Sequence, residues 1–134
     1  TVKKVVPLNG YTHDEVLRIA ACLEEHFPHS VANAIVNQAK KEGLIHEEEH
    51  AKVEYILAHG IATRFYGKRA IIGSDHLIFE DEGIPKTEEL NETIGSLESE
   101  VAESMIYLEI DNQVAGIISI YDPLKLEENK LIII

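Results

Sequence analysis

The sequence predicts an α+β fold, with a mainly antiparallel β-sheet flanked by helices. Two amphipathic helical patterns come first along the chain, and short apolar segments separated by turn residues follow them. Short strands joined by tight turns pair antiparallel, and each apolar helix face needs a sheet or another helix to cover it. The chain has 134 residues, of which 45% are hydrophobic. We therefore expect one domain whose core forms without disulfide bonds.

The first predicted elements are a strand and a helix. Val2–Leu8 alternates weakly between apolar and polar residues, and the Asn9-Gly10 pair that follows favours a tight turn. Thr12 and Glu15 have the spacing of a capping box, in which each side chain accepts a hydrogen bond from the backbone N–H of the other residue. The apolar stripe after them predicts a helix over about residues 13–25.

A second helix is expected directly after the first. Pro28 interrupts the helical pattern, because a proline inside a helix removes a hydrogen bond and clashes with the preceding turn. The pattern resumes over about residues 29–42, and Gly43 favours the end of this second helix. Its predicted inward-facing residues are Val31, Ile35 and Ala39.

The rest of the chain is predicted to supply most of the sheet. The Asp111-Asn112 pair predicts a hairpin, since both residue types tolerate the positive φ of a tight turn. A polar helix is expected over about residues 85–100, whereas His76–Glu80 has no clear pattern. The expected strands are Val53–Ile56, Ile61–Phe65, Arg69–Ile72, Ile106–Ile110 and Val114–Tyr121.

Charge and cysteine content exclude several classes of protein. The net charge of −12 argues against binding to nucleic acid or to anionic membrane surfaces, because both repel an acidic protein. No apolar stretch approaches the roughly 20 residues of a membrane span, and no signal peptide is visible. We expect a soluble chain, either by itself or as a piece of a membrane protein. The single cysteine, Cys22, excludes an intramolecular disulfide and is expected to be a buried structural thiol.

Four residues have the properties that an adenine site needs. Adenine requires an apolar slot, an acceptor for its exocyclic amine and close approach of the backbone. Glu24 can accept that hydrogen bond, and His29 offers a flat ring for stacking together with a ring nitrogen. Gly60 lets a strand backbone approach a ligand closely, and Ile61 can supply an apolar wall. Each residue alone is more often a surface or turn residue, so the interpretation depends on their combined order.

That combined order resembles a known family. The motifs that carry the resemblance are Leu23-Glu24, His29-Ser30-Val31-Ala32, the segment Gly60–Gly67, the step Ile72-Gly73-Ser74 and the run Gly116–Lys125. Together they resemble the ATP-binding (N) domain of heavy-metal-transporting (P1B-type) P-type ATPases. The resemblance covers residues 1–125, which it identifies as the N domain, and leaves 126–134 as a tail that it does not assign. It implies a sheet of about six strands flanked by helices.

The resemblance also implies which residues hold the nucleotide. Glu24 is expected to contact the adenine amine, and His29 is expected to orient the ring. Ser30, Ala58 and Ser74 depart from the family pattern, which has proline, glycine and asparagine at these positions. The full implied set of nucleotide-binding residues is Glu24, His29, Ser30, Ala58, Gly60, Ile61, Gly73 and Ser74.

A division of labour follows from the same resemblance. The implied cofactors are ATP and Mg²⁺, the metal being bound through the nucleotide phosphates. The chain contains neither the Asp-Lys-Thr-Gly-Thr phosphorylation motif of the family nor a Walker loop. We therefore expect no catalytic residue, little activity of the fragment alone, and presentation of ATP to an aspartate elsewhere in the parent pump. The implied partners are the phosphorylation domain and the membrane helices of that pump, in which this fragment is cytoplasmic and touches no membrane.

An alternative interpretation is an acidic, histidine-containing metal-binding or regulatory module without a role in transport. The segment His46–His50, which reads His-Glu-Glu-Glu-His, matches the H-E-x-x-H pattern of zinc peptidases. On a helix, the two histidines would share one face and Glu47 could act as a base. The pattern is short, and an acidic chain rich in histidine matches it readily by chance.

Overall fold

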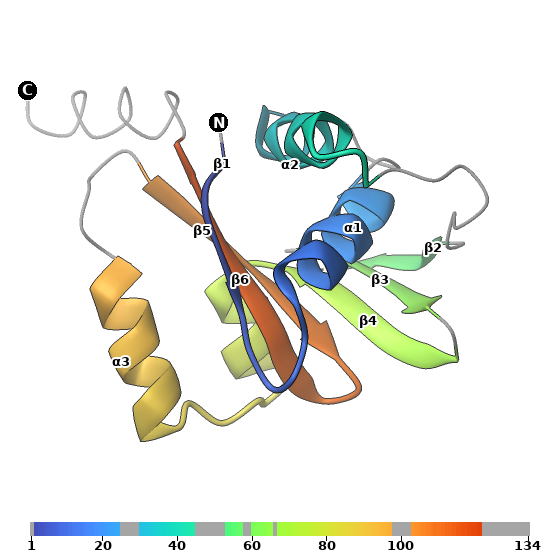
Figure 1. Cartoon of the computed structure of the whole chain (residues 1–134). Helices are drawn as coiled ribbons and strands as arrows, with labels where there is room; N and C mark the ends of the chain where they lie inside the picture. The colour runs from blue at the N-terminus through green and yellow to red at the C-terminus, as the bar shows by residue number, and fades with distance from the viewer. Residues whose placement is uncertain are drawn as a thin grey trace, which may run out of the picture.

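The computed structural model describes residues 2–24, 30–44, 53–57, 60–65, 67–97 and 103–121. This part of the chain contains a six-stranded sheet in the order β1-β6-β5-β4-β3-β2 (Figure 1). All neighbouring strands pair antiparallel. The strands are β1 (Val2–Pro7), β2 (Val53–Leu57), β3 (Gly60–Phe65), β4 (Lys68–Gly73), β5 (Glu103–Ile110) and β6 (Gln113–Tyr121).

Helices flank the sheet on both faces (Figure 1). The first helical pair packs on one face, where its apolar residues form a core with alternate residues of β4, β5 and β6. A short helix and a third α-helix form a second core on the other face. The helices are α1 (His13–Glu24), α2 (Ser30–Lys41), the short π-helix η2 (His76–Asp81) and α3 (Glu88–Leu97). The predicted fold class is therefore confirmed.

The covering of both faces explains the sequence of the central strands. Along β5, Leu108 and Ile110 belong to the core under α1, whereas Tyr107 belongs to the core beside η2 and α3. Successive side chains of a strand point to opposite faces, so a strand buried on both sides reads as a continuous apolar run. This is why β5 and β6 lack a simple alternation of apolar and polar residues.

The local signals for the first helical pair are confirmed. The backbone N–H of Thr12 donates to Glu15 Oε1 at 3.0 Å, and the N–H of Glu15 donates to Thr12 Oγ1 at 3.2 Å, which is the predicted capping box. Ile35 and Ala39 are buried, as expected. Gly43 has a φ of 71° and ends the second helix, with the N–H of Leu44 donating to the Ala39 carbonyl.

Both predicted tight turns are also present. Asn9 and Gly10 have positive φ values of 53° and 87°, and Asn9 Nδ2 donates to the Val114 carbonyl at 2.8 Å. Asp111 and Asn112 have φ values of 52° and 68°, which matches the type I′ turn that suits the twist of a hairpin. Turn residues visible in the sequence therefore form the connection from β1 to α1 and the hairpin between β5 and β6.

Two elements differ from the sequence-based expectation in character. His76–Asp81 forms a π-helix, in which the N–H of Glu82 donates to the Leu77 carbonyl five residues earlier. The third α-helix is amphipathic rather than simply polar, because Leu90, Ile94 and Leu97 are buried.

Cys22 is buried, as predicted. Pro28, the segment 45–52 and the tail 126–134 lie outside the described residues.

Within the described ranges, the structure contains no helix that is both long and apolar enough to span a bilayer.

Helix α1 lies close against β6 at Gly116. A methyl group added at this glycine would lie 2.5 Å from Val16 Cγ1 and 2.8 Å from Val16 Cγ2. Carbon atoms in contact are normally about 3.5–4.0 Å apart, so only a residue without a Cβ fits here. The absence of a side chain at Gly116 therefore lets α1 lie close against β6.

This contact predicts a strong effect of one methyl group. We expect Gly116→Ala to destabilise the fold by about 1–3 kcal/mol, because the added Cβ overpacks the interface with Val16. Adding Val16→Ala to Gly116→Ala should restore part of this loss. Gly95→Ala is the matched control, since nothing lies within 4 Å of a Cβ built there and alanine favours the helix. Urea unfolding of the four proteins measures these effects, and equal stabilities of both single glycine variants would contradict the packing argument.

Candidate functional site

The predicted nucleotide-binding residues fall into three groups in the structure. Glu24, Gly73 and Ser74 are fully described. Ser30 begins α2, and Gly60 and Ile61 begin β3, so their backbones are placed in the fold. His29 and Ala58 lie outside the described residues, and their predicted roles stay predictions.

Two of the predicted glycines meet across the sheet. Gly60 of β3 pairs with Gly73 of β4, and Ile61 pairs with Ile72 one step along. Gly73 also pairs with Tyr107 of β5 and is buried. Two glycines in one cross-strand pair leave a place on the sheet without Cβ atoms, where a ligand can approach the backbone. Two sequence motifs that are separate along the chain, one containing Gly60 and the other Gly73, therefore lie side by side in the sheet.

The carboxyl group of Glu24 lies in an apolar environment. Glu24 is the last residue of α1 and is only 5% exposed, and α1 contacts both β3 and β4. Burial raises the pKa of Glu24 to about 7, because a charged carboxylate is costly away from water. A carboxyl group with this pKa changes its protonation near neutral pH and keeps an oxygen that can accept a hydrogen bond in either state.

Ser74 has a structural contact in addition to its predicted role. Its carbonyl accepts a hydrogen bond from the N–H of Ile78 at 3.2 Å, and its Oγ lies 3.4 Å from the N–H of Leu77. The next residue, Asp75, accepts a bond from the N–H of His76 at 2.8 Å and caps the helix. The segment that follows Gly73 is therefore held by the first turn of η2.

A surface depression of about 250 Å³ lies at a different place. Its walls come from the end of β1, the hairpin between β5 and β6, and the residues before and within the first turn of α3. The lining includes Leu8, Ile84, Pro85, Leu90 and Val114 and none of the predicted nucleotide-binding residues. Shape alone does not make this depression the nucleotide site, because glycines suited to close approach and the buried acceptor lie elsewhere.

A further polar group, not predicted from the sequence, is buried in the sheet near Glu82, the residue that ends η2. Glu109 of β5 is 1% exposed, and Arg69 of β4 forms an ion pair with Glu82 at 2.6 Å beside it. Burial and, to a smaller extent, the charge of Glu82 raise the pKa of Glu109 to about 7, although the charge of Arg69 acts in the opposite direction. No motif contains these three residues, which the packing of η2 on the sheet brings together.

Comparison with known proteins finds metal-transporting ATPases among the relatives of this chain. No family model matches the chain. A probable copper-exporting P-type ATPase of Archaeoglobus fulgidus is 35% identical over 124 residues, which is 92% of this chain and 14% of that protein. A zinc-transporting ATPase of Synechocystis sp. is 31% identical over 124 residues, again 92% of this chain and 15% of that protein. The chain therefore spans about one seventh of the length of these curated relatives.

Solved structures agree on the fold. A zinc-transporting PIB-type ATPase in its E2.Pi state matches 88% of this chain with a TM-score of 0.68 and 26% identity, over 18% of its own length. The N-domain of a copper-transporting P-type ATPase matches 90% of this chain with a TM-score of 0.71 and 24% identity. The match covers 98% of that N-domain, so the two chains have the same extent of fold.

The buried carboxyl of Glu109 predicts a pH-dependent stability. Its pKa is about 7 in the folded protein and 4.5 ordinarily, so the folded state holds the proton more tightly. The stabilisation is complete below about pH 4.5 and is lost as the pH rises through about 7. Glu109→Gln should flatten this dependence and be on the order of 1–3 kcal/mol more stable than the original chain at pH 8.

Urea unfolding between pH 4.5 and pH 8 measures this effect. Glu92→Gln, at an exposed position of α3, is the matched control and should keep the pH dependence of the original chain. The raised pKa of Glu24 also makes the free energy of unfolding fall as the pH rises, so Glu109→Gln removes only part of the pH dependence of stability. Parallel curves for Glu109→Gln and the original chain would contradict the assignment.

Proposed function

We propose that this chain, whose homologues are heavy-metal-transporting P-type ATPases and whose fold is that of their N-domain, binds the adenosine end of ATP. The parent protein is a cation-translocating ATPase, and this segment delivers the γ-phosphate to an aspartate in another of its domains. Because the chain spans about one seventh of its relatives, the phosphorylation domain and the membrane helices are supplied by the rest of that protein. The segment itself is cytoplasmic in this proposal.

One observation carries the proposed site. The Gly60–Gly73 pair lies on β3 and β4, both of which α1 contacts, and Glu24, whose carboxyl is buried, ends that helix. A Cβ-free place on a sheet suits a flat ring, and an apolar environment strengthens a hydrogen bond to the carboxyl. The requirements of adenine for close backbone approach and for an acceptor therefore point to the same region of the fold.

Each predicted residue has a specific role in this proposal. Glu24 accepts a hydrogen bond from the exocyclic amine of adenine, and His29 stacks on the ring and orients it. Gly60 and Gly73 admit the ring to the sheet. The remaining lining residues are Ser30, Ala58, Ile61 and Ser74. Mg²⁺ enters with the nucleotide phosphates and uses no ligand from this site, so the domain's task is binding and positioning.

The alternative of a zinc site at His46 and His50 is not favoured. Relatives that are 35% and 31% identical to this chain are transport ATPases, and similarity to each extends over 92% of the chain. Both histidines lie outside the described residues. The proposed function therefore does not include them.

Nucleotide titration tests the proposed site. We expect calorimetry to detect ATP, ADP and AMP at similar affinities and GTP at a lower affinity, because recognition is at the base. His29→Ala and Glu24→Ala should each weaken ATP binding about tenfold or more, since each removes a contact of about 1.5–3 kcal/mol. Glu24→Gln keeps an acceptor oxygen and should retain more affinity than Glu24→Ala. His76→Ala, an exposed histidine on η2, is the control.

Two outcomes of this titration would reject the proposal. One is the absence of binding by any adenine nucleotide at millimolar concentration. The other is equal loss of affinity in His29→Ala and His76→Ala, which would mean that position 29 has no specific role. Circular dichroism of each variant separates lost contacts from lost folding.

The departures from the family pattern predict a gain of affinity. Ala58 stands where the family has the first glycine of a Gly-x-Gly motif, so its methyl group is expected to crowd the nucleotide. Ala58→Gly should therefore tighten ATP binding severalfold, because removal of the Cβ allows closer approach. Ala34→Gly, within α2, is the matched control and should destabilise the helix without tightening binding. Unchanged or weaker ATP binding by Ala58→Gly would place the nucleotide away from residue 58.

A further inference from the structure

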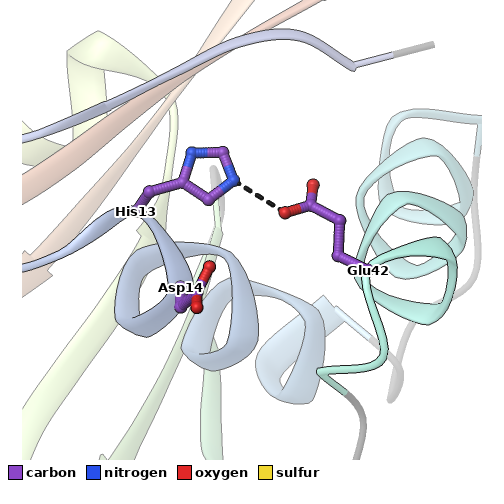
Figure 2. Close-up of side chains that lie close together, drawn as sticks. All are labelled: His13, Asp14 and Glu42. Carbon is purple, nitrogen blue, oxygen red and sulfur yellow. Dashed lines mark hydrogen bonds and ion pairs between the residues drawn. The ribbon is translucent and has the colours of Figure 1, made fainter.

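A second cluster of polar side chains lies where the start of α1 meets the end of α2. His13 and Asp14 begin α1, and Glu42 follows the last residue of α2 (Figure 2). The ligand atoms of the three side chains all lie within 4.8 Å of one another. His13 Nε2 lies 2.9 Å from Glu42 Oε1, which the dashed line in Figure 2 marks.

The packing of the two helices preorganises this cluster. α1 and α2 contact each other, so the start of one helix lies beside the end of the other. Gln38, one turn before Glu42, donates a hydrogen bond from Nε2 to Glu42 Oε2 at 2.8 Å. This hydrogen bond is the main cause that holds the pKa of Glu42 below its ordinary value, and the hydrogen bond and charge of His13 act in the same direction. Glu42 is therefore ionised at neutral pH and held in place from its other side, with Oε1 directed at His13.

We propose that His13, Asp14 and Glu42 bind one divalent transition-metal cation. In a tetrahedral site whose ligand atoms lie about 2.0–2.1 Å from the metal, two ligand atoms are about 3.3 Å apart. His13 Nε2 and Glu42 Oε1 lie 2.9 Å apart, so they need to separate by less than about 1 Å. Three atoms within 4.8 Å of one another also lie within about 2.8 Å of a common point. Side-chain movements of less than about 1 Å complete the coordination shell.

The ligand chemistry favours a transition metal over magnesium or calcium. An imidazole nitrogen suits Zn²⁺, Co²⁺, Ni²⁺ and Cu²⁺, whereas Mg²⁺ and Ca²⁺ prefer oxygen alone. The two carboxylates balance the charge of a divalent ion. The side chains of His13 and Glu42 are 46% and 29% exposed, so water can occupy the remaining coordination positions.

The helix dipoles at this place oppose each other. A cation is disfavoured near the N-terminus of α1, where His13 and Asp14 lie, and favoured near the C-terminus of α2, beside Glu42. These contributions largely offset, so binding depends on the three ligands. The cation replaces the hydrogen bond between His13 and Glu42, and a proton on Nε2 leaves to solvent when the metal binds.

The proposed metal site is independent of the proposed nucleotide site. His13 begins α1 and Glu24 ends it, and the twelve residues of this helix span about 18 Å. Metal binding here therefore requires no nucleotide, and failure of one proposal leaves the other intact.

Titration of the 134-residue chain with ZnCl2 tests the site. Calorimetry gives the stoichiometry, and NMR of ¹⁵N-labelled histidine rings identifies the nitrogen that coordinates. We expect the ring signals of His13 to shift with saturation, and His13→Ala and Glu42→Gln each to weaken this binding about tenfold or more. The double variant His46→Ala/His50→Ala should retain the His13 site, as should His76→Ala. MgCl2 should produce no saturable shift of the His13 ring.

Two results would overturn the proposal. One is a ZnCl2 titration in which the His13 ring does not shift up to millimolar metal. The other is unchanged zinc affinity and stoichiometry in both His13→Ala and Glu42→Gln when circular dichroism shows that they are folded. Glu42→Gln keeps the size of the side chain and its contact with Gln38, so it separates ligand loss from helix disruption.

Discussion

The close approach of α1 to the sheet at Gly116 is the constraint on which the rest of the architecture depends. Val16 occupies the space that any Cβ at residue 116 would take. The helix can therefore lie close enough to the sheet for its apolar face to form a core with β4, β5 and β6. Its position then places Glu24, at the other end of the helix, in a buried environment and brings His13 beside Glu42.

A sheet covered on both faces has a consequence for the proposed function. The nucleotide cannot lie across the middle of either face, because α1 and α2 occupy one and η2 and α3 occupy the other. Binding is left to the edges and ends of elements, and the Gly60–Gly73 pair lies where β3 begins and β4 ends. In the proposed function, this domain holds the base and another domain carries out phosphoryl transfer.

Features that depend on residues close together in the chain were predictable from the sequence. The capping box of Thr12 and Glu15 and the turn at Asp111-Asn112 depend on neighbouring residues, and both are present. The pairing of Gly60 with Gly73 was not predicted, because it depends on the register in which Phe65 pairs with Lys68 across the turn. Glu109 could not be predicted as buried, because its environment depends on how η2 packs. His13 and Glu42 are 29 residues apart, and only the packing of two helices joins them.

The central claim is that adenine lies against the sheet at the Gly60–Gly73 pair, beside the end of α1. Intermolecular nuclear Overhauser effects from the H2 and H8 protons of bound AMP measure this position directly. The account predicts contacts to the Hα protons of Gly60 and Gly73 and to the side chain of Glu24. Contacts to Leu8, Ile84 and Leu90, which line the depression near α3, would contradict it.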